Sequence, residues 1–386
     1  MDRVRLRRPS GAALTTAAYF AMMVVIGVVY GATGPTLRGL AAQAGVGLAQ
    51  IGVILSARSF GYFLATTVVG RLIDRVHAHR VAAGVIVIAA ALVALIPAAR
   101  SLWVLALLMA GLGMTLAGLD VGSNTLVLRQ RADRPGPYMN ALHLFFGVGG
   151  FLAPFLVALT GSETAISWPY WTIALLILPI AGWLLLRPAP ERDRSTAEEI
   201  PSKTVRGLLF LGCVVFFFYV GAEIGLSTWI YEYARLSFPA PLATGMTSAF
   251  WASFTLFRLL GVLVSAKVRA RTVAVADLAV GIAGAGLLAI GRAVPPLIWV
   301  GTILCGGAIA SFYATFLVLL SERIPMTGQR MGIVALSATV GSMSFPWVIG
   351  RVFEAFPLSM PLIIGADLAL ALGLLAVLLK RDWRTA

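Results

Sequence analysis

Charged residues are scarce in this chain, and so are the residues that build metal or disulfide sites. Only 12% of the 386 residues are charged, whereas 59% are hydrophobic. A soluble domain carries about 25% charged residues, so the composition excludes an ordinary soluble fold. The two cysteines, Cys213 and Cys305, and three histidines show no metal-binding or disulfide spacing. No nucleotide-binding loop is present, so we expect no cofactor, no metal and no use of ATP.

The net charge of +14 does not indicate nucleic-acid binding. Lysine and arginine are spread over the ends of apolar runs, whereas a nucleic-acid interface gathers them on one face or tail. The sequence therefore predicts a lipid bilayer as the main surrounding, with no nucleic-acid partner.

The apolar residues form about twelve runs separated by short loops, each close to the roughly 20 residues that a helix needs to cross a bilayer. Backbone polar groups inside lipid must bond within a helix or a closed barrel. The predicted fold is therefore an all-α integral membrane protein with twelve transmembrane helices. The helices are predicted at 12–34, 48–70, 81–98, 102–127, 139–160, 168–187, 206–232, 243–265, 273–291, 295–320, 331–355 and 358–379.

Most of the 30 lysines and arginines flank every second loop of this pattern. An excess of basic residues marks the cytoplasmic side of a membrane protein. Both termini are therefore predicted to be cytoplasmic, in the inner (plasma) membrane of a cell. The first apolar run is longer than that of a secretion signal and is interpreted as a membrane helix.

Residues 188–205 are rich in proline and in charges of both signs, and they lie near the middle of the chain. They predict a cytoplasmic linker between two pseudo-symmetric six-helix bundles, 1–187 and 206–386. The halves also match weakly at a constant offset, with Gly70 facing Gly261 and Gly150 facing Gly341 in an alignment. Repeats of this kind occur in transporters that rock around a site in the middle of the membrane.

Three ionisable residues fall well inside predicted helices: Arg58, Asp120 and Glu223. Such residues are costly in a bilayer and are functional candidates by default. Asp120 and Asn124 share one helix face, and the internal repeat relates that face to Ser311 and Thr315. The predicted substrate-binding residues are Tyr30, Arg58, Asp120, Asn124, Tyr219, Glu223, Ser227, Trp229, Ser311 and Thr315.

Carboxylates and amides suit sugar hydroxyls, and aromatic rings cover the apolar face of a sugar. Asp120 and Glu223 are also predicted to couple transport to protons, because a carboxylate can take up and release one as its access alternates. Two alternatives stay open. The carboxylates could be structural partners of Arg58, or Arg58 could bind an anionic substrate directly.

Gly70-Arg71-Leu72-Ile73-Asp74-Arg75 resembles the loop signature of the major facilitator superfamily, although His77 replaces a later glycine. The resemblance implies that the first, fourth, seventh and tenth helices line a central cavity. It also implies a gating role at the cytoplasmic side for Gly70, Asp74 and Arg75.

Shorter segments resemble sugar transporters of this superfamily. Tyr219–Glu223 and Leu119–Asn124 resemble segments of fucose permease-like proteins, and Gly34–Leu37 resembles the sodium-dependent glucose transporter group. Gly31 stands where fucose permeases carry an acidic residue, which argues against fucose as the substrate.

The sequence therefore predicts a monomeric secondary active transporter, not an enzyme. It would move a small polar solute, a sugar or sugar-like compound, by alternating access and with H⁺ as coupling ion, with Na⁺ as the other candidate. Rival hypotheses are a drug/proton antiporter, an organic-anion carrier, a membrane acyltransferase and a non-transporting membrane sensor.

Overall fold

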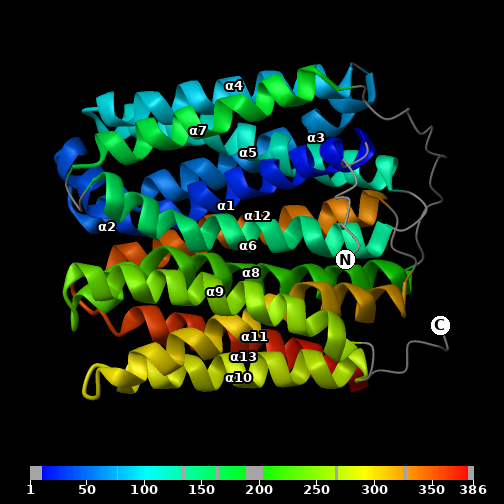
Figure 1. The fold of residues 1–386 in the computed structure, drawn as a ribbon. Helices are drawn as coiled ribbons and strands as arrows, with labels where there is room; N and C mark the ends of the chain where they lie inside the picture. Colours follow the sequence, from blue (N-terminus) through cyan, green and yellow to red (C-terminus); the bar gives the residue numbers. More distant parts are fainter. Residues whose placement is uncertain are drawn as a thin grey trace, which may run out of the picture.

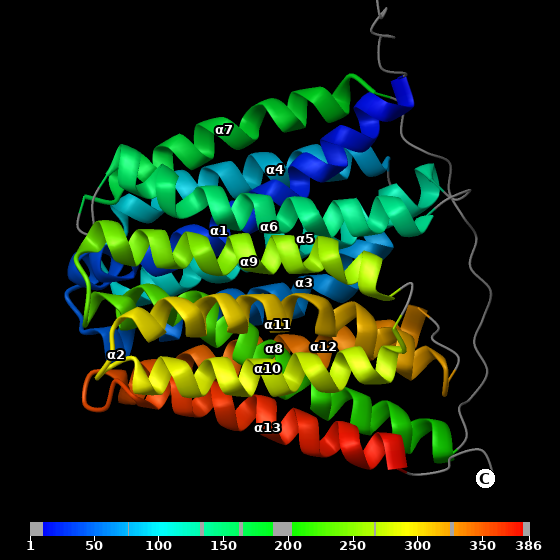
Figure 2. The same ribbon diagram turned by 60° about the horizontal axis from the view of Figure 1, so that its bottom comes forward.

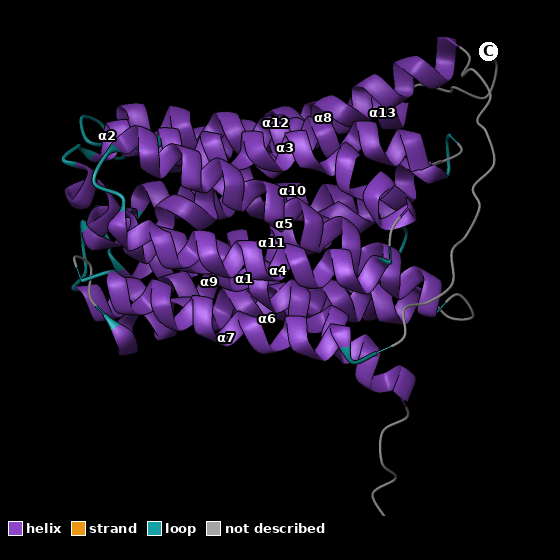
Figure 3. Ribbon diagram, turned by 90° about the horizontal axis from the view of Figure 1, so that it is seen from above, coloured by secondary structure: helices purple, strands orange, loops and turns teal. Residues whose placement is uncertain are grey.

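The computed structural model describes residues 11–75, 77–131, 135–161, 165–187, 203–265, 268–324 and 328–380. Within these ranges the chain is helical and contains no strand (Figure 3). The helices are α1 (Gly11–Ala44), α2 (Leu48–Ile51), α3 (Val53–Arg75), α4 (Ala78–Leu95), α5 (Leu102–Gln130), α6 (Pro135–Thr160), α7 (Ser167–Leu185), α8 (Lys203–Arg235), α9 (Ala240–Ser265), α10 (Ala270–Ile290), α11 (Pro296–Ser321), α12 (Gly328–Phe353) and α13 (Ser359–Lys380), with a 3₁₀ turn at Ile96–Ala98.

Twelve long helices and the short α2 confirm the predicted all-α membrane fold. Eleven helices are long and apolar enough to cross a bilayer on length and composition. The remaining long helix, α9, carries more serine and threonine and includes Arg258, but it runs alongside the others in the bundle (Figure 1).

The first helix is longer than the sequence predicted, because it continues through Pro35 to Ala44. Proline removes one backbone hydrogen bond within a helix, yet the residues beyond it are held by burial of Leu37 and Leu40. The helix ends where Gly45 adopts a φ of +66°, and Val46 N donates to the Ala41 carbonyl at 3.0 Å. This is a Schellman cap, which only glycine adopts without strain.

The helices form two groups by their packing. Helices α1–α7, the N-terminal group, pack mainly on one another, and so do α8–α13, the C-terminal group. Helices α4 and α7 lie at one edge of the molecule, and α10 and α13 lie at the opposite edge (Figures 1 and 2). The groups meet chiefly where α6 packs on α9 and α12 packs on α3.

Helix α1 begins and α13 ends at the same end of the bundle, here called the termini end (Figure 1). Toward the opposite, far end, polar contacts between described residues join the groups. Arg38 Nε forms a salt bridge with Glu232 Oε2 at 2.7 Å. The Leu48 backbone N–H at the start of α2 donates to Glu354 Oε1 at 2.8 Å.

Several predicted features fall outside the described residues. Residues 188–202 of the predicted linker lie there, and 203–205 already belong to α8. Gly70, Asp74 and Arg75 lie in the last turns of α3, but nothing beyond their helical backbone is described. The division into two domains and the gating role therefore stay predictions.

Candidate functional site

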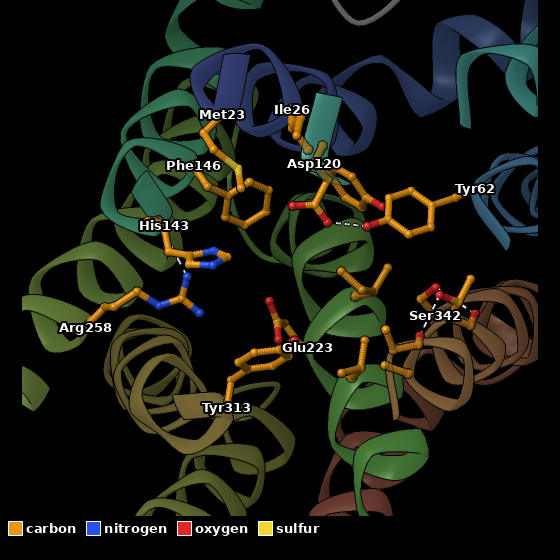
Figure 4. A pocket seen from close by; sticks show the side chains of 16 residues that line it. Met23, Ile26, Tyr62, Asp120, His143, Phe146, Glu223, Arg258, Tyr313 and Ser342 are labelled. Atoms are coloured by element: carbon orange, nitrogen blue, oxygen red, sulfur yellow. Dashed lines mark hydrogen bonds between the residues drawn. The ribbon is translucent and has the colours of Figure 1, made fainter. Parts of the chain in front are cut away.

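A cavity of about 200 Å³ lies where the two groups of helices meet (Figure 4). Helices α1, α5, α8 and α11 contribute to its wall, together with α3, α6, α9 and α12. The lining residues are Met23, Ile26, Tyr30, Tyr62, Asp120, His143, Phe146, Val220, Glu223, Ile224, Arg258, Tyr313, Ala335, Ala338, Thr339 and Ser342.

Asp120 forms the polar centre of the N-terminal wall. The Tyr62 hydroxyl of α3 donates to Asp120 Oδ2, and Asn124 Nδ2 donates to Asp120 Oδ1 at 2.7 Å. Asn124 lies one turn along α5 and also donates to the Asp120 carbonyl at 2.8 Å. Both carboxylate oxygens are thus oriented, which gives the cavity a fixed hydrogen-bond acceptor.

Glu223 forms the polar centre of the C-terminal wall, and its carboxylate projects into the cavity beside Tyr313 (Figure 4). The Tyr219 hydroxyl lies next to Glu223, but it donates its proton to the Ile309 carbonyl at 2.7 Å. The Glu223 carboxylate is therefore less tightly held than that of Asp120.

Arg258 and His143 lie in the wall on the side of α9 and α6 (Figure 4). Arg258 Nε donates to the Ala310 carbonyl at 3.2 Å. Its guanidinium carbon lies over the Phe254 ring, 4.5 Å from the ring centroid. Arg258 is not among the substrate-binding residues that the sequence predicted. The structure instead makes it a cation of the cavity wall.

Tyr30 of α1 separates the cavity from Arg58. The Arg58 guanidinium lies 4.2 Å from the centroid of the Tyr30 ring. Arg58 is buried, and its Nη1 donates to Thr33 Oγ1 at 2.8 Å. In the described part of the chain it pairs with neither Asp120 nor Glu223, so the predicted cluster of Arg58 with these carboxylates is not formed. Arg58 also lies behind the wall, and not on it.

Six other predicted substrate ligands do not line this cavity, and one of them is Asn124, whose amide donates to Asp120. Tyr219 and Trp229 are fully buried, and Trp229 Nε1 donates to the Pro346 carbonyl at 2.9 Å. Ser311 Oγ donates to the Asp277 carboxylate at 2.8 Å, which turns it toward α10. The Ser227 and Thr315 hydroxyls donate to carbonyls of their own helices, those of Ile224 and Ser311. Direct substrate contact by these residues stays an untested prediction.

The structure adds wall residues that sequence reasoning missed: Tyr62, His143, Phe146, Arg258, Tyr313, Thr339 and Ser342. Single hydroxyls and aromatic rings in apolar helices give no signal until their orientation is known. Arg258 and His143, ionisable residues within predicted membrane helices, could have been found by the rule that selected Asp120 and Glu223. No group of three His, Cys, Asp or Glu suited to a metal occurs among the described residues.

Comparison with known proteins agrees with this geometry. The family model of the Major Facilitator Superfamily matches residues 15–346. The sodium-dependent glucose transporter 1A of Mus musculus is 25% identical over 379 residues, which cover 88% of this chain and 89% of the relative.

Two solved structures share the fold over nearly the whole chain. The D-xylose-proton symporter has a TM-score of 0.80 at 14% identity, covering 95% of this chain and 97% of that one. The nucleoside transporter NupG has a TM-score of 0.73 at 15% identity, covering 97% of this chain and 100% of that one. The predicted resemblance is confirmed, and the chain belongs to the major facilitator superfamily of solute transporters.

Proposed function

We propose that this chain is a secondary active transporter that moves a sugar or sugar-like polyol, coupled to protons. The observation that carries the proposal is the cavity between the two groups of helices, with a carboxylate on each wall and aromatic rings between them. Solute sites in rocking transporters lie at this position, near the middle of the membrane.

The chemistry of the wall suits a small polyhydroxylated solute. Asp120 offers oriented acceptor oxygens, Arg258 offers donors, and Tyr30 and Phe146 offer ring surfaces for the apolar face of a sugar. The volume of about 200 Å³ lies below the roughly 300–1,000 Å³ of sites for drug-sized ligands. The cavity therefore favours a small solute over the drug/proton antiporter hypothesis.

The position of Arg58 bears on the charge of the solute. Its guanidinium is covered by Tyr30 and does not reach the wall, so it supplies no anion site in this conformation. The wall carries two carboxylates against one arginine, Arg258. This balance favours a neutral solute over an organic anion.

The names of the relatives support a sugar but leave the ion open. The mouse relative is called a sodium-dependent glucose transporter, whereas the structurally similar symporter is called a D-xylose-proton symporter. We assign the coupling ion as H⁺, because Glu223 lies in the wall beside few fixed donors and can exchange a proton with the cavity.

The proposed motion is alternating access by rocking of the two groups, joined by the linker at 188–205. With the termini end on the cytoplasmic side, the Arg38–Glu232 and Leu48–Glu354 contacts close the outer end of the pathway. Gly70, Asp74 and Arg75 would gate the inner end. We propose a monomer as the transporting unit.

Uptake by the purified protein in proteoliposomes tests the proposal. Labelled aldoses, polyols, sugar acids and nucleosides are measured in counterflow, and then in accumulation driven separately by a proton and by a sodium gradient. We expect counterflow of at least one neutral sugar and accumulation with protons alone. Glu322→Gln, which removes an exposed carboxylate outside the cavity, serves as control.

Three results would contradict parts of the proposal. Accumulation that requires a sodium gradient would mean that Na⁺, and not H⁺, is the coupling ion. Counterflow of sugar acids alone would mean that the solute is an anion and not a neutral sugar. Failure of every solute to exchange, with a folded protein, would favour the sensor hypothesis.

A further inference from the structure

Arg258 connects the two groups of helices at the edge of the cavity. It belongs to α9 of the C-terminal group, and its Nε donates to the Ala310 carbonyl of the same group. Its Nη1 reaches the His143 carbonyl on α6 of the N-terminal group at 3.5 Å (Figure 4). That distance is at the long limit of a hydrogen bond, so the link is weak and easily exchanged.

The link continues a tight contact between α6 and α9. A Cβ atom on Gly150 would clash with the Trp251 ring, and one on Gly147 would clash with Thr255 Oγ1. Small residues allow membrane helices to approach this closely. The Arg258–His143 hydrogen bond lies one further turn toward the termini end. We call these three contacts the α6–α9 seam.

Glu223 faces Arg258 from the same cavity wall (Figure 4). Arg258 is the arginine that lines the cavity together with Glu223, but the two form no salt bridge among the described residues. Opposite charges attract far more strongly in a low-dielectric interior than in water. An ionised Glu223 would therefore draw Arg258 away from His143, and a protonated Glu223 would leave it there.

We propose that Arg258 is the positioning residue that couples protonation of Glu223 to the α6–α9 seam. One proton binds a Glu223 oxygen and neutralises it, and Arg258 then keeps its hydrogen bond to the His143 carbonyl. When the proton leaves, Arg258 turns to the Glu223 carboxylate and the seam loses its contact nearest the termini end. This inference rests on the proposed proton-coupled transport.

Several other titratable side chains surround Glu223. They come from α1, α3, α5, α6, α8 and α11 and are Tyr30, Tyr62, Asp120, His143, Tyr219 and Tyr313. Helix α12 contributes the hydroxyls of Thr339 and Ser342. Among these described groups, Arg258 is the one whose hydrogen bonds reach both α11 of its own group and α6 of the opposite group.

The experiment measures the seam directly and needs no solute. Spin labels are placed on cysteines introduced at Met139 of α6 and Val264 of α9, with Cys213 and Cys305 changed to serine. Double electron–electron resonance then gives the label distance at mildly acidic and mildly alkaline pH. We expect the mean distance of the otherwise unchanged protein to increase by at least ~2 Å at alkaline pH, the scale of helix shifts in switching proteins.

The variants separate the proposed link from a general pH effect. Glu223→Gln should stay at the acidic distance at both pH values, and Arg258→Gln should lose the pH response. Arg258→Lys, which keeps the charge, should retain part of it. Arg351→Gln is the matched control, because Arg351 stacks on Trp347 at 5.1 Å, away from the cavity.

Two results would overturn the inference: a distance that does not change with pH in the unchanged protein, or a full pH response in a folded Arg258→Gln variant. Because no solute is present, the seam response is independent of the sugar assignment. A normal response without sugar transport would overturn only the proposed function.

Discussion

Asp120 and Glu223 face one cavity from opposite groups of helices, but their carboxylates have different neighbours. Asp120 accepts hydrogen bonds from Tyr62 and Asn124 on its two oxygens. Glu223 lies beside a tyrosine whose proton is committed elsewhere and faces Arg258. The comparison indicates that Asp120 is preorganised to bind solute, whereas Glu223 is freer to change its charge and its partner.

The strongest test of this comparison is Asp120→Asn. The substitution puts an amide beside Tyr62 and Asn124 and removes the charged acceptor, which is worth about 1.5–3 kcal/mol per hydrogen bond. We expect the affinity for solute in counterflow to fall roughly 10- to 150-fold, with exchange and accumulation reduced together. Solute-induced thermal shifts and counterflow at varied solute concentration measure this.

A different outcome would give Asp120 the second role that the sequence predicts for it. If Asp120→Asn loses accumulation but keeps exchange, then Asp120 also carries the coupling proton and the two walls do not differ in function. Glu322→Gln should leave both measurements unchanged, since this carboxylate is exposed.

Tyr62→Phe should have a smaller effect on the same wall. It removes the hydroxyl that donates to Asp120 Oδ2 but keeps the ring. A single hydrogen bond contributes about 1 kcal/mol, so the affinity should fall roughly fivefold. In a double variant with Asp120→Asn, the loss of binding free energy should be smaller than the sum of the losses in the two single variants. Double-mutant cycles show such non-additivity for residues in contact. Full additivity would mean that Tyr62 acts on the solute independently of Asp120.

The sequence predicted the fold and the two carboxylates for the same reason. Long apolar runs require helices, and a charge within such a run stands out without knowledge of the fold. The orientation of uncharged side chains is less accessible. Trp229 lies six positions beyond Glu223, which is about 240° around a helix of 3.6 residues per turn, so it points away from the cavity face. Arg258 is also a charge within an apolar run, but only the packing of α9 against α6 shows that it reaches the cavity.

Trp229→Phe should therefore affect stability and not binding. Trp229 is buried, and its Nε1 donates to the Pro346 carbonyl. Loss of that hydrogen bond and of the packing of the larger indole ring should destabilise the protein by about 1–2 kcal/mol. The melting temperature in detergent should fall while the solute affinity of the folded fraction changes less than twofold. A large loss of solute affinity with an unchanged melting temperature would mean that Trp229 contacts the solute, as the sequence predicted.

The smallest effect on binding is expected at Ser311, and a second serine provides the matched control. The internal repeat predicted that Ser311 contacts solute, but its hydroxyl donates to Asp277. Ser342 was not predicted, yet it lines the cavity on α12. Both changes to alanine remove one hydroxyl that already has a partner, since Ser342 Oγ lies 3.2 Å from Ser59 Oγ and 2.8 Å from the Thr339 carbonyl, but only Ser342 lines the cavity. In counterflow, the affinity for solute should change at most twofold for Ser311→Ala. For Ser342→Ala it should fall roughly two- to fivefold, which corresponds to a loss of up to about 1 kcal/mol of binding free energy. The opposite order would mean that α11 presents Ser311 to the solute in another conformation of the transport cycle, and that the repeat describes that conformation better than this one.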